Sequence, residues 1–485
     1  MKRDVFSAKW LDSRIRSEDT QKSEQILGYF LGPCMVYMVY FGLAGTYLTQ
    51  FYTDVLGFAG GFFTLMPLMS KVLSGVVGLL IGRFIDRTRT NQGKARPWIL
   101  ISGPLLTICG ILLYIVPRAS YEVQMIWIVI SYNLFFSLAF STYSLSHSLM
   151  VPLSTRNTKQ RDGLAMLTST GTSMIPGMLT TVVMPLLVRR LGVGADAQSA
   201  WLAVMSVLSI IAIPATLLEY YFTKERVTAE AMAVIEKKDE VSFTTQITMC
   251  FRDRYWVMVV LFMLTVNLCS GLSTNSMLYY CNWVLGNSVE SGATKQILAN
   301  MIGQAPMGYG IVILWPLVRK FGKRRVAIVG FTIAAIGALV VFLGKDNMIL
   351  VLGGLLIKST GALPTYVMAA LLAEALDHLE WKNGLRADGF SASVQSIIQT
   401  VIMGLSQTIL LAGINAFGYI APESPTQVII QPEAIRSFFG WCFTGIPMIG
   451  YIVCAVIMMF YDIEAKIPQI SAELEARKNE KSNQS

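Results

Sequence analysis

The stretch KVLSGVVGLLIGRFIDRTRTNQGKARPWILISGPLLTIC, from Lys71 to Cys109, contains two apolar runs separated by a short charged turn. Each run belongs to a segment of about 20 mostly apolar residues, the length that an α-helix needs to cross a hydrocarbon core of about 30 Å. The turn carries the basic residues Arg83, Arg87, Arg89, Lys94 and Arg96. Because basic turns remain on the cytoplasmic side, the stretch predicts a hairpin of two membrane-spanning helices.

The composition of the whole chain agrees with this local pattern. Of 485 residues, 54% are hydrophobic and only 14% are charged, and the mean hydropathy is +0.54. This balance excludes an ordinary soluble fold. The net charge of +9 arises from Lys and Arg clusters between apolar runs, where they orient a membrane protein, so no nucleic-acid partner is expected.

Similar apolar runs recur along nearly the whole chain and predict an all-α protein with twelve spanning helices. The predicted spans are residues 26–50, 59–84, 98–117, 124–150, 163–188, 198–222, 254–281, 293–318, 325–344, 348–374, 389–418 and 436–461. The longest polar interruption separates two six-helix bundles, 26–222 and 254–461, with a cytoplasmic N-terminal segment at 1–25, a cytoplasmic central loop at 223–253 and a cytoplasmic tail at 462–485. This layout is similar to that of the major facilitator superfamily.

The two bundles also share a weak repeat, since YTDVLG (Tyr52 to Gly57) and CNWVLG (Cys281 to Gly286) end the first and seventh spans. Related halves are expected where one half moves against the other during transport. Basic residues accumulate in alternate loops, which places both termini in the cytoplasm. The polar first 25 residues lack the features of a cleavable signal peptide.

The sequence offers no metal or cofactor pattern. The seven cysteines are scattered without a CxxC pair and are interpreted as small apolar packing residues. The only histidines are His147 and His378, which have no metal-ligand spacing. We therefore expect no metal, no cofactor and no enzymatic activity.

Three motifs carry a resemblance to a known family. They are YTDVLGF (Tyr52 to Phe58), GRFIDRTRTNQGKARPWIL (Gly82 to Leu100) and AEALDHLEWKNGLRADGFSASVQS (Ala373 to Ser396). In sequence and order they resemble the glycoside–pentoside–hexuronide symporters, of which melibiose permease is the best-known member. The resemblance implies a multi-pass transporter of the bacterial inner (plasma) membrane that moves a sugar or sugar acid with a cation by alternating access. The oligomeric state stays open, with a monomer as the simplest expectation.

Two of these motifs contain charged residues that are candidates for a cytoplasmic gate. The candidates are Asp86, Arg87, Arg89 and Arg96 in the first half and Asp377, Glu380 and Arg386 in a corresponding loop of the second half. Salt bridges between such loops can close one side of a transporter in one state and break in the other. The alternative is that these charges only fix the topology.

The family's binding residues are largely replaced. Its two cation-binding aspartates on helix two correspond to Ser74 and Gly78, so the sodium site as the family builds it is expected to be absent. Its sugar-site residues correspond to Met38, His147, a position near Ser169, Thr365 and Thr400, while Tyr143 and Gln395 retain the expected type. Paired carboxylates for sugar hydroxyls therefore cannot be carried over.

Ionisable residues within a membrane are costly and are candidates for function. Lys71, His147 and Lys358 lie well inside their predicted spans. The carboxylates Asp54, Glu219 and Glu374 fall near helix ends. We therefore expect no carboxylate at the depth of His147.

Residues three, four or seven apart share a helix face, and this spacing groups the candidate substrate-binding residues. They are Lys71, Tyr143, His147, Asn275, Tyr279, Lys358, Thr365, Gln395, Gln399 and Thr400. For the small polar residues the alternative is helix packing. For the histidine it is a neutral, hydrogen-bonded ring, and for the lysines it is snorkelling to the interface.

Two deep lysines without a deep carboxylate favour an anionic solute, such as a hexuronide or another acidic sugar. Proton coupling is expected because the ordinary pKa of histidine, about 6.5, lies close to physiological pH. The candidate coupling residues are His147, Lys71 and Ser74. The alternatives are a cation-coupled carrier of neutral glycosides or pentosides, an exchanger or facilitator, a carrier of amphipathic lipids, a membrane enzyme, or a transport-like sensor.

Overall fold

A computed structural model describes residues 11–15, 17, 19–43, 46–58, 62–88, 90, 92–155, 158–226, 243–384, 388–470, 472–474 and 476. Within these ranges the regular structure is helical, apart from one isolated bridge between Thr90 and Gly93. The chain divides into two compact units. Unit 1 comprises residues 1–238 and 420–427, and unit 2 comprises residues 239–419 and 428–485.

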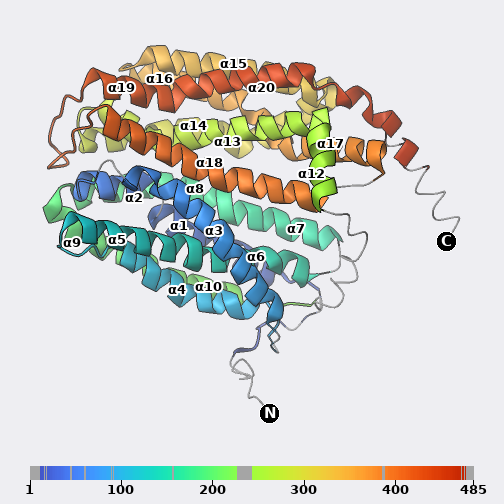
Figure 1. The fold of residues 1–485 in the computed structure, drawn as a ribbon, viewed down its shortest axis with the longest axis horizontal. Helices are drawn as coiled ribbons and strands as arrows, with labels where there is room; N and C mark the ends of the chain where they lie inside the picture. Colours follow the sequence, from blue (N-terminus) through green and yellow to red (C-terminus); the bar gives the residue numbers. More distant parts are fainter. Residues whose placement is uncertain are drawn as a thin grey trace. The chain divides into compact units, whose positions relative to one another are not determined.

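Unit 1 contains α-helices, short π-helical segments and one 3₁₀ turn, drawn from blue to green in Figure 1. Its elements are η2 (Glu24–Leu31), α1 (Gly32–Leu43), α2 (Thr46–Gln50), η3 (Phe51–Val55), α3 (Phe62–Arg87), α4 (Arg96–Tyr114), α5 (Tyr121–Asn133), η4 (Leu134–Phe140), α6 (Ser141–Ser154), α7 (Thr158–Ser169), η5 (Thr170–Met174), α8 (Ile175–Leu191), η6 (Ala195–Ala197), α9 (Gln198–Ile210) and α10 (Ala212–Tyr221).

The described part of unit 2 begins at Phe243 and is drawn from green to red. Its elements are α12 (Phe243–Arg252), α13 (Arg254–Trp283), α14 (Val289–Phe321), α15 (Lys323–Gly344), α16 (Met348–Gly361), η7 (Leu363–Val367), α17 (Met368–Asn383), α18 (Asp388–Ala416), α19 (Glu433–Gly440), η8 (Trp441–Gly445), α20 (Ile446–Phe460) and η9 (Ile463–Ala465). Helix α12 lies in the segment that the sequence predicts as a central loop.

Eleven helical segments in the described part of the chain are long and apolar enough to cross a membrane. They confirm the prediction of an all-helical membrane protein. The predicted eighth span, 293–318, corresponds to the continuous 33-residue helix α14, which is not among the eleven. The count of twelve spans and the cytoplasmic termini therefore stay predictions.

One boundary differs in a way that matters for the charged motif of unit 2. The sequence predicts that the tenth span ends at residue 374 and that a loop follows, but α17 continues to Asn383. The segment AEALDHLEWKN is rich in strong helix formers, and the helix ends only at Gly384, whose φ of 71° suits glycine. Asp377 and Glu380 therefore lie on a helix, so their placement in a loop is wrong.

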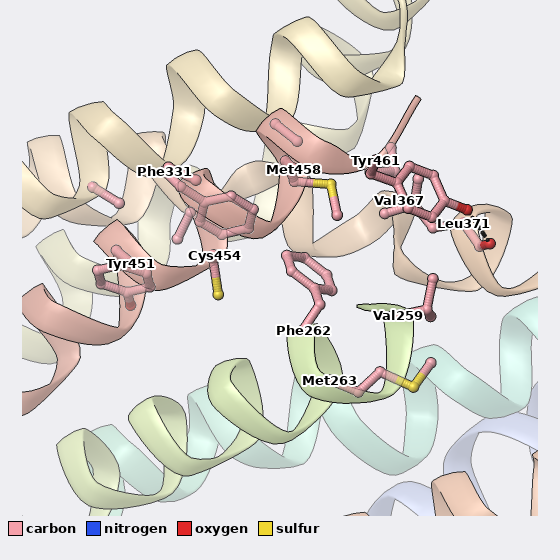
Figure 2. Packing of buried hydrophobic residues seen from close by; sticks show 14 of the residues in the cluster. Val259, Phe262, Met263, Phe331, Val367, Leu371, Tyr451, Cys454, Met458 and Tyr461 are labelled. Carbon is pink, nitrogen blue, oxygen red and sulfur yellow. Dashed lines mark hydrogen bonds between the residues drawn. The ribbon is translucent and has the colours of Figure 1, made fainter. Parts of the chain in front are cut away.

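The core of unit 2 forms where α13, α15 and α20 meet (Figure 2). Phe262 of α13 packs edge to face against Phe331 of α15, with ring centroids 5.3 Å apart, and Cys454 and Met458 of α20 lie beside them. Tyr461 donates a hydrogen bond to the Leu371 carbonyl at 2.8 Å, which joins α17 to the end of α20. The core thus fixes the helices that carry the unit's polar residues.

Helices α15 and α16 approach closely because small residues face each other. A Cβ on Gly337 would collide with the backbone of Lys358, and one on Gly361 would collide with Ala334. Such small-residue contacts are the usual basis of tight helix pairing in membranes. All seven cysteines are buried and unpaired, in agreement with a packing role.

Candidate coupling and binding residues

A buried cluster of three polar side chains lies inside unit 1. Tyr143 and His147 are one turn apart on α6, and both face Glu219 of α10. The Tyr143 hydroxyl donates to Glu219 Oε2 at 2.6 Å, and His147 Nδ1 lies 2.6 Å from Glu219 Oε1. All three are 3% exposed or less. Each carboxylate oxygen of Glu219 therefore has a short hydrogen bond to a neighbouring helix.

Close helix packing buries this cluster. A Cβ on Gly32 would lie 2.9 Å from the Glu219 Cβ, so the absence of a side chain allows the first span to approach α10. The Tyr37 ring of α1 covers Tyr143 and His147, with centroid distances of 6.2 and 6.5 Å. His147 Nε2 is buried and has no hydrogen-bond partner among the described residues.

The expectation that no carboxylate reaches the depth of His147 is wrong. Glu219 lies two residues before the end of α10, but it is 1% exposed and bonded directly to that histidine. Position along the sequence is misleading here because Gly32 of α1 packs directly against Glu219 in the last turn of α10. The available signal was that Glu219 is the one acid in the apolar run from Gln198 to Phe222.

In unit 2 the deep lysine has a different environment. Lys358 is 8% exposed, and its Nζ donates to Ser273 Oγ at 3.0 Å and to the Phe443 carbonyl at 3.4 Å. The ammonium group also lies 5.1 Å from the centroid of the Phe443 ring. No described carboxylate forms an ion pair with it, so neutral groups alone support its charge.

Lys71 of α3 is partly exposed, with its Nζ 4.9 Å from the centroid of the Phe136 ring. Within the described part of the chain it too has no carboxylate partner. One turn along α3, Ser74 Oγ lies 2.7 Å from Ser137 Oγ and donates to the Ser70 carbonyl at 2.8 Å. Ser74 thus links α3 to η4, as the packing alternative predicts.

The remaining binding candidates of unit 2 lie in different environments, from fully buried to exposed. Asn275 Nδ2 donates to Ser406 Oγ at 3.1 Å, which joins α13 to α18. Tyr279 is fully buried and stacks on Phe439, with ring centroids 5.3 Å apart. The other four candidates range from partly to largely exposed: Thr365 in η7 and Gln395, Gln399 and Thr400 on α18.

The charged turn of unit 1 is fixed from within the unit. Arg96, which is 3% exposed, donates to the Tyr220 carbonyl at 2.9 Å and to Gln92 Oε1 at 2.9 Å. The Glu225 carboxylate accepts from the backbone N–H groups of residues 94, 95 and 96 at 2.8 to 2.9 Å. These N–H groups at the start of α4 have no partner within the helix, and a negatively charged group stabilises the helix start by accepting from them.

The same arrangement recurs in unit 2. The Glu464 carboxylate accepts from the backbone N–H groups of Lys323 and Arg324, at 2.8 and 3.1 Å, at the start of α15. In both units a glycine with positive φ precedes the capped helix, Gly93 at 105° and Gly322 at 83°. Glu225 lies shortly after α10 and Glu464 lies in η9 shortly after α20, so in each unit an acid close behind a late helix caps an earlier one. This supports the sequence repeat.

Unit 2 also has a histidine–carboxylate pair, at the start of α13. Asp253 caps this helix by accepting from the N–H groups of Tyr255 and Trp256, and His378 Nδ1 lies 2.7 Å from its Oδ2. Burial raises the pKa of Asp253, but the hydrogen bonds from His378 and from the Trp256 N–H outweigh it and hold that pKa below its ordinary value. Nearby, Lys323 pairs with Glu374.

The structure describes only some of the predicted gate residues. Arg87 is exposed, Asp377 and Glu380 are partly exposed on α17, and Arg96 is buried in its own unit. Arg89, Arg386 and the side chain of Asp86 lie outside the described residues. The role of these charges as a gate stays a prediction.

The chain is similar to known membrane transporters over nearly its whole length. A family model described as MFS/sugar transport protein matches residues 28–465. The isoprimeverose transporter of Lactiplantibacillus pentosus is 24% identical over 443 residues, which cover 90% of this chain and 88% of the relative. The glucuronide carrier protein homolog of Escherichia coli (strain K12) is 22% identical over 460 residues, which cover 93% of this chain and 95% of the relative.

A solved structure, that of the D-xylose-proton symporter, superimposes with a TM-score of 0.58 at 15% identity and covers 89% of this chain and 96% of that chain. At this identity it supports the fold alone. The curated relatives confirm the resemblance to glycoside–pentoside–hexuronide symporters. This chain belongs to the MFS/sugar transport protein family and is a multi-pass transporter of a bacterial inner membrane.

Proposed function

We propose that this protein is a proton-coupled symporter for an acidic sugar, a hexuronide or another anionic glycoside, and that it works by alternating access. The observation that carries the proposal is the environment of Lys358. Among the residues that the structure describes, this buried ammonium group contacts a hydroxyl, a carbonyl and an aromatic face but no countercharge, which a cation in a membrane interior requires. A carboxylate on the solute supplies that countercharge.

Lys71 of unit 1 also favours a negatively charged solute. Its ammonium group lies over an aromatic ring and has no carboxylate partner in the described structure. The name of one relative, a glucuronide carrier protein homolog, agrees with an anionic sugar. Proton coupling is supported by His147, and by Ser74 and Gly78 at positions where the family has cation-binding aspartates.

The test is uptake into proteoliposomes of labelled uronides, neutral glycosides and pentoses under an imposed proton or sodium gradient. We expect proton-driven uptake of acidic sugars. Lys358→Gln and Lys71→Gln should reduce uptake of acidic sugars much more than uptake of neutral ones. Lys295→Gln is the matched control, because that lysine already donates to the Leu285 carbonyl, just after the end of α13. Sodium-driven uptake of neutral sugars that is unaffected by both changes contradicts the proposal.

A second candidate is a carrier of neutral glycosides, and one group of side chains favours it. The Tyr40 and Phe140 rings stack with centroids 3.8 Å apart, and Tyr37 packs edge to face on Phe140 at 5.5 Å. Ligand pockets are lined mainly by apolar and aromatic side chains, so these rings are candidates for the wall of a site that holds an uncharged sugar. The isoprimeverose transporter is a relative whose printed name agrees with this alternative. The same uptake panel separates the two candidates.

A further inference from the structure

The cluster of Glu219, His147 and Tyr143 contains a feature that the proposed function does not include. Glu219 is a carboxylate whose two oxygens are bonded by α6 side chains and by no backbone N–H group of the described residues. It lies near the C-terminal end of α10, where the helix dipole disfavours a negative charge. An anion is therefore poorly supported at this position.

The surroundings add little positive charge. Tyr29 and Tyr37 are close enough to interact electrostatically with Glu219, and neither carries charge at neutral pH. Other charged groups are engaged elsewhere, since Arg226 pairs with the buried Glu24 at 2.8 Å. The described charged side chains of α3 and α4 are Lys71, held against the Phe136 ring, Arg96, bound to the Tyr220 carbonyl, and Arg83 and Arg87, which are exposed. The further titratable side chains of α1, α4 and α10 are uncharged at neutral pH: Cys34, Tyr40, Cys109, Tyr114, Tyr220 and Tyr221.

We propose that Glu219 and His147 together form the proton-binding site of the symporter, with Glu219 as the group that makes the site bind a proton. With a neutral imidazole and an ionised carboxylate, the pair carries one negative charge. One proton from a hydronium ion of the aqueous phase forms a new N–H or O–H bond within the pair, while its O–H bond in the hydronium ion breaks and a water molecule is released. The net charge of the pair becomes zero, and the proton returns to water by the reverse step when the site opens to the other side.

The second ring nitrogen of His147 also responds to this proton. When Nδ1 donates its hydrogen to Glu219, Nε2 of the neutral ring carries a lone pair and accepts hydrogen bonds. When the ring is protonated, Nε2 becomes a donor. This buried nitrogen has no protein partner in the described structure, so its hydrogen-bonding capacity changes with the protonation state of the pair. Tyr143 positions Glu219 through the second carboxylate oxygen.

Histidine NMR tests this site without any transport substrate. Because the chain has only two histidines, ¹⁵N-histidine labelling gives two sets of ring signals, and His378→Gln identifies those of His147. We expect the His147 nitrogens to show a fixed tautomer with a hydrogen-bonded Nδ1–H. Glu219→Gln should shift these signals and leave those of His378 in place. Unchanged His147 signals in Glu219→Gln would overturn the inference.

Transport then tests the role of the site, and this step rests on the proposed function. Glu219→Gln should lose proton-driven accumulation but retain exchange of the same solute between the two sides of the membrane, which also shows that the variant is folded. Tyr143→Phe should weaken accumulation less, and His378→Gln should keep both activities. Normal accumulation in Glu219→Gln refutes the coupling role. If no solute in the panel is transported, the proposed function fails while the NMR result stands on its own.

Discussion

The two histidines of this chain make the same contact in two different settings. His147 Nδ1 lies 2.6 Å from a carboxylate oxygen of Glu219, and His378 Nδ1 lies 2.7 Å from one of Asp253. Asp253 stands at the start of α13 and also accepts two backbone N–H bonds, whereas Glu219 stands near the end of α10 and accepts from side chains. Each pair lies within one unit of the molecule.

The difference shows that the position of the carboxylate along its helix determines whether the helix backbone stabilises its negative charge. A helix start provides unsatisfied donors and a positive partial charge, so it stabilises Asp253 as an anion. A helix end provides the opposite field, so Glu219 depends on its partners or on a proton. We infer that the His378 pair fastens helices together and that the His147 pair exchanges protons. The predictions below separate these two roles.

The largest effect is expected when His147 is removed and Glu219 remains. In His147→Leu the buried carboxylate loses one partner, and breaking a buried charged pair from one side costs about 3–5 kcal/mol. Thermal unfolding of the purified protein in detergent measures the loss of stability.

The control for this prediction is the double variant His147→Leu with Glu219→Leu, which removes both partners and leaves no buried charge. It should recover most of the lost stability, because removing a whole buried pair is often close to neutral. If the double variant is as unstable as the single one, packing and not charge explains the effect, and the two histidine pairs are more alike than we infer.

The helical class and the transporter family could be predicted from sequence, because about 20-residue apolar runs and charged turns are direct signatures of membrane helices. His147 and Lys358 could also be found, since ionisable residues inside apolar runs are conspicuous. Glu219 was missed because position within one helix says little about burial, which here depends on Gly32 of another helix. Asp253 and Glu225 were missed because capping contacts depend on how a loop folds back.

A smaller effect is expected at the other pair. Asp253→Ala removes the cap of α13 and leaves two backbone donors unsatisfied, and loss of such a cap typically costs about 0.5–2 kcal/mol. Because this carboxylate fastens a helix start, solute accumulation per folded molecule should be unchanged. Chemical or thermal unfolding gives the first quantity and proteoliposome uptake the second. Intact stability with lost accumulation would reverse the roles that we assign to the two pairs.

The smallest expected effect is a dependence of stability on acid pH at Asp253. The pKa of Asp253 in the folded protein lies below its ordinary value, about 3.9 in the unfolded chain. Its contribution to stability is therefore complete above about pH 4 and decreases as the pH falls through the lower folded pKa.

Asp253→Asn keeps an oxygen for the cap but cannot ionise. Its deficit in the free energy of unfolding relative to the unmodified protein should therefore be present at pH 6 and shrink toward pH 3. We expect this deficit to be about 1 kcal/mol or less, within the range of a charge at a helix terminus. A deficit that stays constant down to pH 3 would show that the ionised form of Asp253 adds nothing beyond its hydrogen bonds, and the helix start would then no longer explain why the two pairs differ.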